Sequence, residues 1–286
     1  VSEKHPTLNQ RCGDAHLATV SFLMDEQDFT TAYVNLERAR IAYEAVVEYY
    51  PDNFLAVFNR AMVHFKQGEL QFKDGQEGQA VWSYGRALED FGHALTLQES
   101  DRLTLIRKGE THSALGDVQY SSAQFAEAAE SYKLGLELFD LALEEKENHA
   151  QTLYLKAIAL ANHAGACLSM SRPDESIVYY QQSIATYRSV IPDKINFGNL
   201  FLNLGVTIVG LGGVYETQQD WASAQKCYRE AVDLLEKEAL EGEKDVLLNK
   251  GMALSRLAYA LSETTLLEEA KQKYQLAADA FVEAAQ

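Results

Sequence analysis

Three histidines recur in the sequence at intervals of 48 residues: His16, His64 and His112. Packed helices lie about 8–10 Å apart, so imidazoles on neighbouring helices could in principle share a metal ion. Later in the chain, however, the same phase is occupied by aliphatic residues, namely Leu160, Ile208 and Leu254. A phase shared by histidine and aliphatic residues is typical of packed positions. We therefore expect packed or hydrogen-bonded histidines, and no metal or cofactor.

Other residues with catalytic potential lack the spacing that catalysis needs. Paired carboxylates such as Glu144–Glu145 and Glu268–Glu269 are common on the solvated faces of acidic helices. The sequence contains no glycine-rich phosphate loop and no nucleophile elbow. The three cysteines show no metal or disulfide spacing, which fits a reducing compartment. These features predict that the chain is not an enzyme.

The charge balance excludes one class of partner. Among 286 residues, 42 are acidic and 25 basic, a formal charge of −17, which repels the phosphates of nucleic acids.

The most apolar stretch, residues 200–215, is shorter than the roughly 20 residues that span a bilayer, so we expect no membrane span. The N-terminus has no basic start followed by an apolar core, so no signal peptide is visible. We therefore predict a cytoplasmic protein.

A period of 48 residues organises most of the chain. Small residues recur at this interval, as do aromatic residues about half a period later, and the last interval shortens to 46 residues. The recurring small residues include Gly13, Ala61, Gly109, Ala157, Gly205 and Gly251, and the aromatic ones include Tyr84, Tyr132, Tyr180, Tyr228 and Tyr274. Six units then account for the whole chain as one domain, at residues 4–51, 52–99, 100–147, 148–195, 196–242 and 243–286.

Spacings of three, four and seven residues within each unit predict helices. Each unit is expected to be a pair of antiparallel helices, which makes the fold all-α. We expect the turns within the first five pairs at residues 25–28, 73–78, 121–124, 169–174 and 217–220. Short polar residues at one phase are predicted to cap the first helix of successive pairs: Asp52, Ser100, Asn148 and Asn196.

The residues of the fifth unit resemble a tetratricopeptide repeat. Leu211-Gly212, Tyr215, Asp220-Trp221, Ala224, Tyr228 and Ala231 match that pattern. A tetratricopeptide repeat normally has 34 residues, so each unit here is 14 longer, which corresponds to one extra heptad in each helix. The stretch from Tyr228 to Lys237 is also weakly similar to the kinesin light chain type of repeat. The resemblance implies a right-handed α-solenoid whose first helices line a concave groove that binds an extended peptide or a partner helix.

Carrying the groove positions of the family onto this sequence implies a set of binding residues. Asn59, Asn203 and Asn249 share one phase and resemble the asparagine ladders that hold a peptide backbone in some superhelical relatives, although solvated helix positions would show the same pattern. Arg107 and Lys66 are expected to meet a carboxylate of the partner. Phe58, Met62 and Tyr154 are expected to act as apolar anchors. The carboxylate clamp of the family is not expected, because Gln10, Asp14 and Leu103 stand at its positions.

These features predict a non-enzymatic scaffold that binds a peptide or helical segment of another protein. Two alternatives stay open: a regulatory domain that senses a small molecule or a peptide, and an acidic chaperone for basic client proteins. The last unit keeps apolar residues such as Tyr274 and Phe281 without a polar capping helix after them. Terminal repeats usually present a polar outer face, so we expect either further chain after Gln286 or self-association through the C-terminal repeat.

Overall fold

The computed structural model describes residues 6–285 except 145, 148, 192–198 and 238–243. The described residues form helices and no strands, as the repeat pattern predicted. Contacts divide the chain into two compact units, which we call unit 1 (Val1–Thr152) and unit 2 (Leu153–Gln286). That all six helix pairs act as a single domain stays a prediction.

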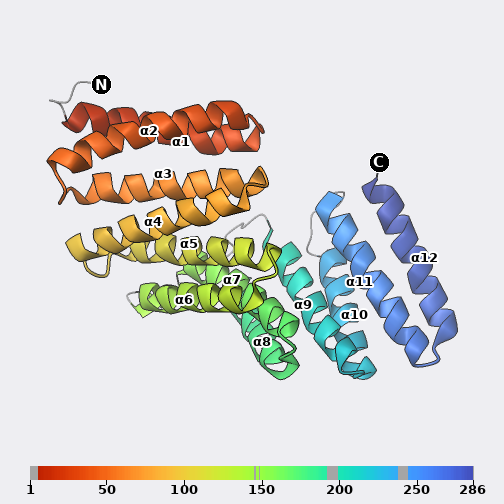
Figure 1. Ribbon diagram of the computed structural model, residues 1–286. Coiled ribbons are helices and arrows are strands. Elements are labelled where there is room, and N and C mark those ends of the chain that lie inside the picture. Colours follow the sequence, from red (N-terminus) through yellow and green to blue (C-terminus); the bar gives the residue numbers. More distant parts are fainter. Residues whose placement is uncertain (1–5, 145, 148, 192–198, 238–243, 286) are drawn as a thin grey trace. The chain divides into compact units, whose positions relative to one another are not determined.

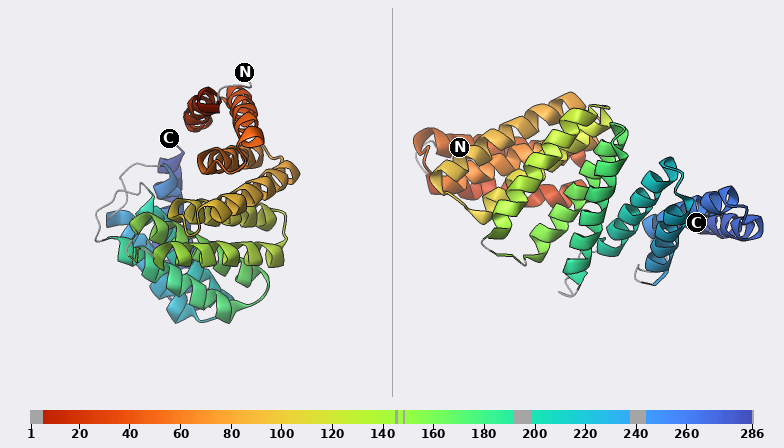
Figure 2. Two further views of the ribbon diagram at one scale, coloured as in Figure 1. Left: turned by 90° about the vertical axis from the view of Figure 1, so that its left-hand side faces the viewer. Right: turned by 90° about the horizontal axis from the view of Figure 1, so that it is seen from below.

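Unit 1 contains three antiparallel helix pairs (Figures 1 and 2). Each pair packs against the next through its second helix, and the first helices α1, α3 and α5 contact one another in turn. The six helices are α1 (Pro6–Asp25), α2 (Phe29–Tyr49), α3 (Phe54–Lys73), α4 (Glu77–Leu97), α5 (Arg102–Ser121) and α6 (Phe125–Glu144).

Unit 2 repeats this arrangement with six more helices. The α7–α8 pair is tied by the Ser176 and Ser183 hydroxyls, which donate to the Ala164 and Ala157 carbonyls at 2.8 and 2.7 Å. The helices are α7 (Ala150–Ser169), α8 (Pro173–Val190), α9 (Leu200–Thr217), α10 (Trp221–Lys237), α11 (Lys244–Glu263) and α12 (Leu267–Ala284). In both units we call the odd-numbered helices first helices and the even-numbered ones second helices.

The turn inside every pair has the same backbone geometry. One residue per turn lies in the left-handed region, and the next residue donates its N–H to a carbonyl five positions earlier, as Asp220 does to Tyr215 at 2.9 Å. This arrangement is the Schellman end of a helix. The turns predicted from the repeat are confirmed. The left-handed residues are Gln27, Gly75, Ala123, Ser171, Gln219 and Thr265.

The predicted caps of the first helices are wrong by one residue. Asn53, not Asp52, accepts the Ala56 N–H at 3.1 Å, and Asp101 caps α5 by accepting the Thr104 N–H at 2.8 Å. Ser100 has a left-handed φ of 61° and precedes the cap. The sequence offers two short polar residues in a row at both places, so spacing alone does not choose between them. Asn148 and Asn196 lie outside the described residues.

In five of the six pairs, an aromatic ring of the second helix packs against a glycine of the first. An added Cβ at Gly68, Gly116 or Gly212 would lie 2.6 Å from a ring carbon of the tyrosine 16 residues later, so only glycine allows this approach. These tyrosines, Tyr84, Tyr132 and Tyr228, are almost fully buried. The α7–α8 pair differs because Ala164 takes the glycine position. Its tyrosine, Tyr180, instead lies against Gly210 of α9, where an added Cβ would be 2.8 Å away.

Helix α9 is rich in aliphatic residues and glycine and contains few polar side chains. Residues Leu200–Thr217 are long and apolar enough to cross a membrane by length and composition alone, in contrast to the expectation from sequence. The structure gives these side chains another environment, because α9 contacts α8, α10 and α11. Leu204, Ile208 and Val214 are at most 2% exposed there, so packing inside unit 2 accounts for much of this apolarity.

Candidate functional site

The asparagines of the predicted ladder connect successive first helices in two of three cases. Asn59 on α3 donates to the Asp14 carboxylate on α1 at 3.0 Å, and Asn203 on α9 donates to the Tyr154 hydroxyl on α7 at 2.8 Å. Asn249 differs, because its amide donates to the Asp245 carbonyl of its own helix at 2.8 Å. No described side chain donates to the amide oxygen of Asn203, so this oxygen keeps its capacity to accept.

Asp14 is the centre of a small polar network in unit 1. Its Oδ1 atom accepts from Asn59 and also from the Tyr43 hydroxyl of α2, at 2.6 Å. Burial of Tyr43 and its contact with this carboxylate raise the pKa of the phenol, so the hydroxyl stays a donor at neutral pH. The network joins α1, α2 and α3.

The two cations predicted to meet a partner carboxylate already have anionic neighbours. Lys66 lies 2.7 Å from Glu69, and Arg107 lies 2.7 Å from Glu110. Burial raises the pKa of Glu110, and Arg107 opposes this shift. Pairs of this kind within one helix contribute only about 0.3–0.5 kcal/mol. A carboxylate of a partner could therefore replace Glu69 at small cost, whereas Glu110, with a side chain only 16% exposed, would be left as a buried carboxylate without its cation.

The predicted apolar anchors occupy three different environments. Phe58 is only 9% exposed and packs between Phe54 and Phe91, with ring centroids 6.0 and 5.6 Å away. Phe58 therefore belongs to the core in this conformation and is not available as an anchor. Met62 is half-buried against the same core. Tyr154 is half-buried, with its ring 6.0 Å from Tyr187 and edge-on to it.

One row of positions on the first helices distinguishes the two units. In unit 1 the row holds Asp14, Met62 and Glu110, which are mostly acidic. In unit 2 the equivalent positions hold Ile158, Val206 and Met252, which are all apolar. Val206 is 43% exposed and Met252 48% exposed. We call this second row, together with the neighbouring Asn203, the first-helix face of unit 2.

The recurring histidines are packed against neighbouring side chains. The His16 ring lies 2.8 Å from the Asn35 amide oxygen. His64 is buried and meets Trp82 edge-on, with centroids 6.3 Å apart. Burial, with a smaller effect of Lys108, lowers the pKa of His112 to about 4. No group of three His, Cys, Asp or Glu residues in the described ranges could hold a metal ion.

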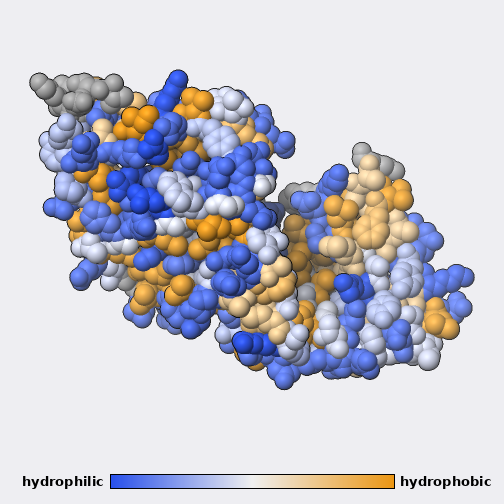
Figure 3. All heavy atoms as spheres, in the orientation of Figure 1, coloured by the Kyte–Doolittle hydropathy of each residue, from blue (hydrophilic) through white to orange (hydrophobic). Residues whose placement is uncertain are grey.

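Apolar side chains are exposed at the outer helices of both units. Leu8 and Phe22 on α1 are 59% and 65% exposed, whereas their equivalents on α3, Ala56 and Leu70, are fully buried. Apolar residues also gather on unit 2 over the start of α11 and the end of α12 (Figure 3). Phe281 on α12 is 38% exposed. Self-association through the C-terminal repeat stays a prediction.

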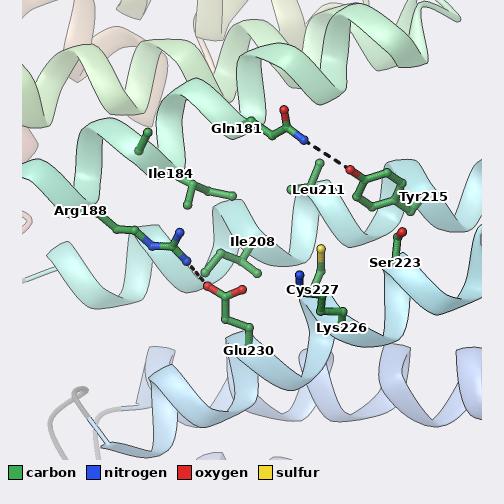
Figure 4. Close-up of a pocket in the computed structure, with 11 residues that line it drawn as sticks. Gln181, Ile184, Arg188, Ile208, Leu211, Tyr215, Ser223, Lys226, Cys227 and Glu230 are labelled. Atoms are coloured by element: carbon green, nitrogen blue, oxygen red, sulfur yellow. Dashed lines mark hydrogen bonds and ion pairs between the residues drawn. The ribbon is translucent and has the colours of Figure 1, made fainter.

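A cleft on the other side of α9 did not emerge from the sequence. It has a volume of about 310 Å³ and lies among the second helices α8 and α10 and the first helix α9 (Figure 4). Ile184, Ile208 and Leu211 form its apolar part. An ion pair between Arg188 and Glu230 lies at one end. At the other end the Gln181 amide donates to the Tyr215 hydroxyl at 3.4 Å.

Comparisons with known proteins give matches in structure only. No family model and no curated protein matches the sequence. BtubC (BKLC) from P. vanneervenii matches with a TM-score of 0.66 and 15% identity, over 86% of this chain and 88% of that one. The apo form of RapI matches with a TM-score of 0.60 and 14% identity, over 95% and 98%. Aspartyl phosphate phosphatase F from Bacillus subtilis matches with a TM-score of 0.57 and 14% identity, over 93% and 69%.

Identities this low establish the fold and nothing about activity. The resemblance drawn from the fifth unit is confirmed at the level of the fold, because the similar structures are of the tetratricopeptide type. The turns, the tyrosine–glycine contacts and the alternation of first and second helices describe the same architecture. The chain is an all-α solenoid of tetratricopeptide-like helical repeats.

Proposed function

We propose that the protein is a non-enzymatic scaffold whose first helices bind a peptide or helical segment of a partner protein. The observation that carries this proposal is the first-helix face of unit 2. Isolated exposed apolar residues are common on protein surfaces, but Ile158, Val206 and Met252 occupy one repeat phase on three successive first helices. The row suits a partner segment that presents apolar side chains.

Asn203 adds a polar group beside this row. Its amide oxygen has capacity to accept a hydrogen bond, and its N–H donor is held by Tyr154 at 2.8 Å. An asparagine held in this way is oriented before a partner arrives, which lowers the entropy lost on binding. We propose that Asn203 accepts a backbone N–H of the partner, with Asn249 and Tyr154 beside it.

Unit 1 is proposed to contribute a polar surface to the same function. Asn59 is held by Asp14, Lys66 faces Glu69, which a partner carboxylate could replace, and Arg107 keeps donors beyond those used by Glu110. Met62 supplies the apolar contact there, since Phe58 is part of the core. We further propose that the protein works in the cytoplasm, and that the exposed C-terminal repeat allows self-association.

A peptide selection tests the proposal without knowledge of the partner. Peptides from a random library displayed on phage are selected on the intact protein, and their affinities are measured by fluorescence anisotropy. Val206→Glu places a charge on the first-helix face, and Val178→Glu is its control, because Val178 is 49% exposed on the second helix α8. We expect binding to weaken at least about tenfold in Val206→Glu, since an apolar contact becomes a buried charge, and to persist in Val178→Glu.

Three outcomes would contradict the proposal in different ways. Failure to select any peptide argues against peptide binding. Equal binding by both valine variants moves the site away from the first-helix face of unit 2. Selection of peptides rich in lysine and arginine, with affinities that fall steeply with salt, favours the acidic chaperone instead.

A further inference from the structure

The cleft of unit 2 has its own composition and faces away from the proposed partner site. Successive residues of a helix are rotated by 100°, so Ile208, which lines the cleft, points about 160° away from Val206 on the same helix. The cleft is reached between α8 and α10, the two second helices (Figure 4). A ligand in the cleft and a partner on the first helices would therefore occupy different surfaces.

The repeat itself explains why this space is open. In the α3–α4 pair of unit 1 the positions equivalent to Ile208 and Lys226 hold His64 and Trp82, and these two rings pack against each other at 6.3 Å. In the α9–α10 pair the histidine is replaced by Ile208 and the tryptophan by Lys226. The aromatic cover is therefore lost, and a volume of about 310 Å³ lies over the apolar floor.

The cleft carries an excess of positive charge within an acidic protein. Its charged lining residues are Arg188, Lys226 and Glu230, two cations and one anion. Arg188 is paired with Glu230. Lys226 forms no ion pair with any described residue. Figure 4 shows its amino group beside Cys227, toward Ile208. The chain as a whole has a charge of −17, so an unpaired ammonium beside an apolar floor is a local feature that favours an anion.

The remaining polar groups of the cleft suit the binding of one anionic group of a ligand, and they lack the features of a catalytic site. Burial raises the pKa of the Cys227 thiol to about 11, so this cysteine is protonated at neutral pH and is a poor nucleophile. Ser223 has no histidine among the other residues that line the cleft to act as its general base, so it is not an activated nucleophile. The Arg188 guanidinium has donors beyond those used by Glu230, and it shares the cleft with Lys226.

We propose that this cleft binds a carboxylate that carries a compact apolar body, with the body on Ile184, Ile208 and Leu211 and the carboxylate at Lys226. Small-molecule sites are typically apolar clefts of about 300–1,000 Å³ with a few polar groups that fix orientation, and the cleft lies at the lower end of this range. The same chemistry is offered by a free aliphatic acid and by the C-terminal residue of a peptide that ends in leucine. The proposal is independent of the partner site on the first helices.

Calorimetric titration of the whole chain with four probes tests the proposal. Octanoate is compared with 1-octanol, which has the same apolar chain without the charge. An acetylated tetrapeptide ending in leucine is compared with its C-terminal amide. We expect at least one carboxylate to bind and its neutral counterpart to bind at least about tenfold more weakly, because the neutral probe loses the charge-assisted hydrogen bond to Lys226. The preferred carboxylate then identifies the source.

Two variants of Lys226 locate the binding, with a control on the same helix. Lys226→Gln removes the charge and is expected to weaken the carboxylate at least about tenfold. Lys226→Trp places in the α9–α10 pair the residue that packs against His64 in the α3–α4 pair, and it is expected to abolish binding by filling the cleft while helicity is unchanged. Lys237→Gln, at the exposed end of α10, is expected to bind as the wild type does.

Several results would overturn the inference. If no carboxylate binds at millimolar concentration, the cleft is not a site of this kind. If octanol binds as tightly as octanoate, or if Lys226→Gln binds as tightly as the wild type, the carboxylate does not lie at Lys226. If Lys226→Trp keeps full binding, the ligand lies outside the cleft.

Discussion

The tyrosine–glycine contact between α9 and α10 predicts opposite effects of the same substitution at two adjacent residues of α9. Gly212 and Gly213 both lie in the interior of this helix. An alanine Cβ at Gly212 would lie 2.6 Å from the buried Tyr228 ring, whereas a Cβ at Gly213 meets nothing within 4 Å. Changing glycine to alanine inside a helix stabilises it by about 1 kcal/mol. Overpacking a core costs about 1–3 kcal/mol.

Gly213→Ala is therefore expected to raise the free energy of unfolding by up to about 1 kcal/mol. Gly212→Ala gains the same helix propensity but forces the new methyl group against the Tyr228 ring. The cost of this overpacking exceeds the gain, so the substitution is expected to lower the free energy of unfolding by up to about 2 kcal/mol. The two variants should differ by about 1–3 kcal/mol. Urea unfolding followed by far-ultraviolet circular dichroism measures both values. A Gly212→Ala protein as stable as Gly213→Ala would show that the ring moves away freely.

A double-mutant cycle tests what holds the ring in place. The Tyr228 hydroxyl donates to Glu216 at 2.7 Å, which fixes the ring over Gly212. In the α7–α8 pair, where Ala164 of α7 replaces the glycine, the equivalent Tyr180 of α8 lies against Gly210 of α9 instead. We expect Gly212→Ala to cost less in a Tyr228→Phe background, because the ring without its hydroxyl can shift. Equal costs in both backgrounds would contradict this role of the hydroxyl.

Three further predictions concern unit 1, and each is measured by denaturant unfolding. Burial lowers the pKa of His112 to about 4, so below about pH 6.5 the histidine is protonated in the unfolded state and still neutral in the folded state. Lowering the pH from 7 to 5 should therefore reduce the free energy of unfolding by about 1–2 kcal/mol, and His112→Leu should remove that loss. Gly75 and Ala123 both lie in the left-handed region, at φ 74° and 59°. Gly75→Ala should therefore lower the free energy of unfolding and Ala123→Gly should raise it, each by about 1 kcal/mol. If both substitutions changed stability in the same direction, this turn geometry would be contradicted. Asp90 is 5% exposed and accepts two hydrogen bonds from Arg60, at 2.9 and 2.6 Å, so Asp90→Ala should cost about 3–5 kcal/mol, because it leaves a cation without its partner.

Much of the fold could be predicted because the repeat constrains it several times over. The period of 48 residues predicted the turns of the first five pairs, and the observed left-handed residues follow the same interval up to Gln219. The caps were placed one residue early because Asp52–Asn53 and Ser100–Asp101 each offer two capping side chains. Only the backbone conformation decides between them: Ser100 is left-handed, and Asp101 accepts the N–H of Thr104.

The candidate site was harder to predict because exposure depends on several helices at once. Phe58 has the phase of a groove position, but Phe91, from the second helix of the same pair, encloses it. The cleft of unit 2 depends on residues from three helices. A signal was present in the sequence, since Lys226 occupies the position that Trp82 occupies in the repeat at residues 52–99. The resulting volume follows only from the packed structure.

Site-specific crosslinking at Val206 tests whether the first-helix face of unit 2 binds a partner protein. A photoreactive amino acid is placed at Val206 on the first-helix face of unit 2, or at Val178 on α8 as the control, since both valines are exposed. The protein is then irradiated in the cells from which it comes. We expect a crosslinked partner protein at Val206 and none at Val178. Absence of a crosslink at Val206, or the same crosslink from both positions, would contradict it.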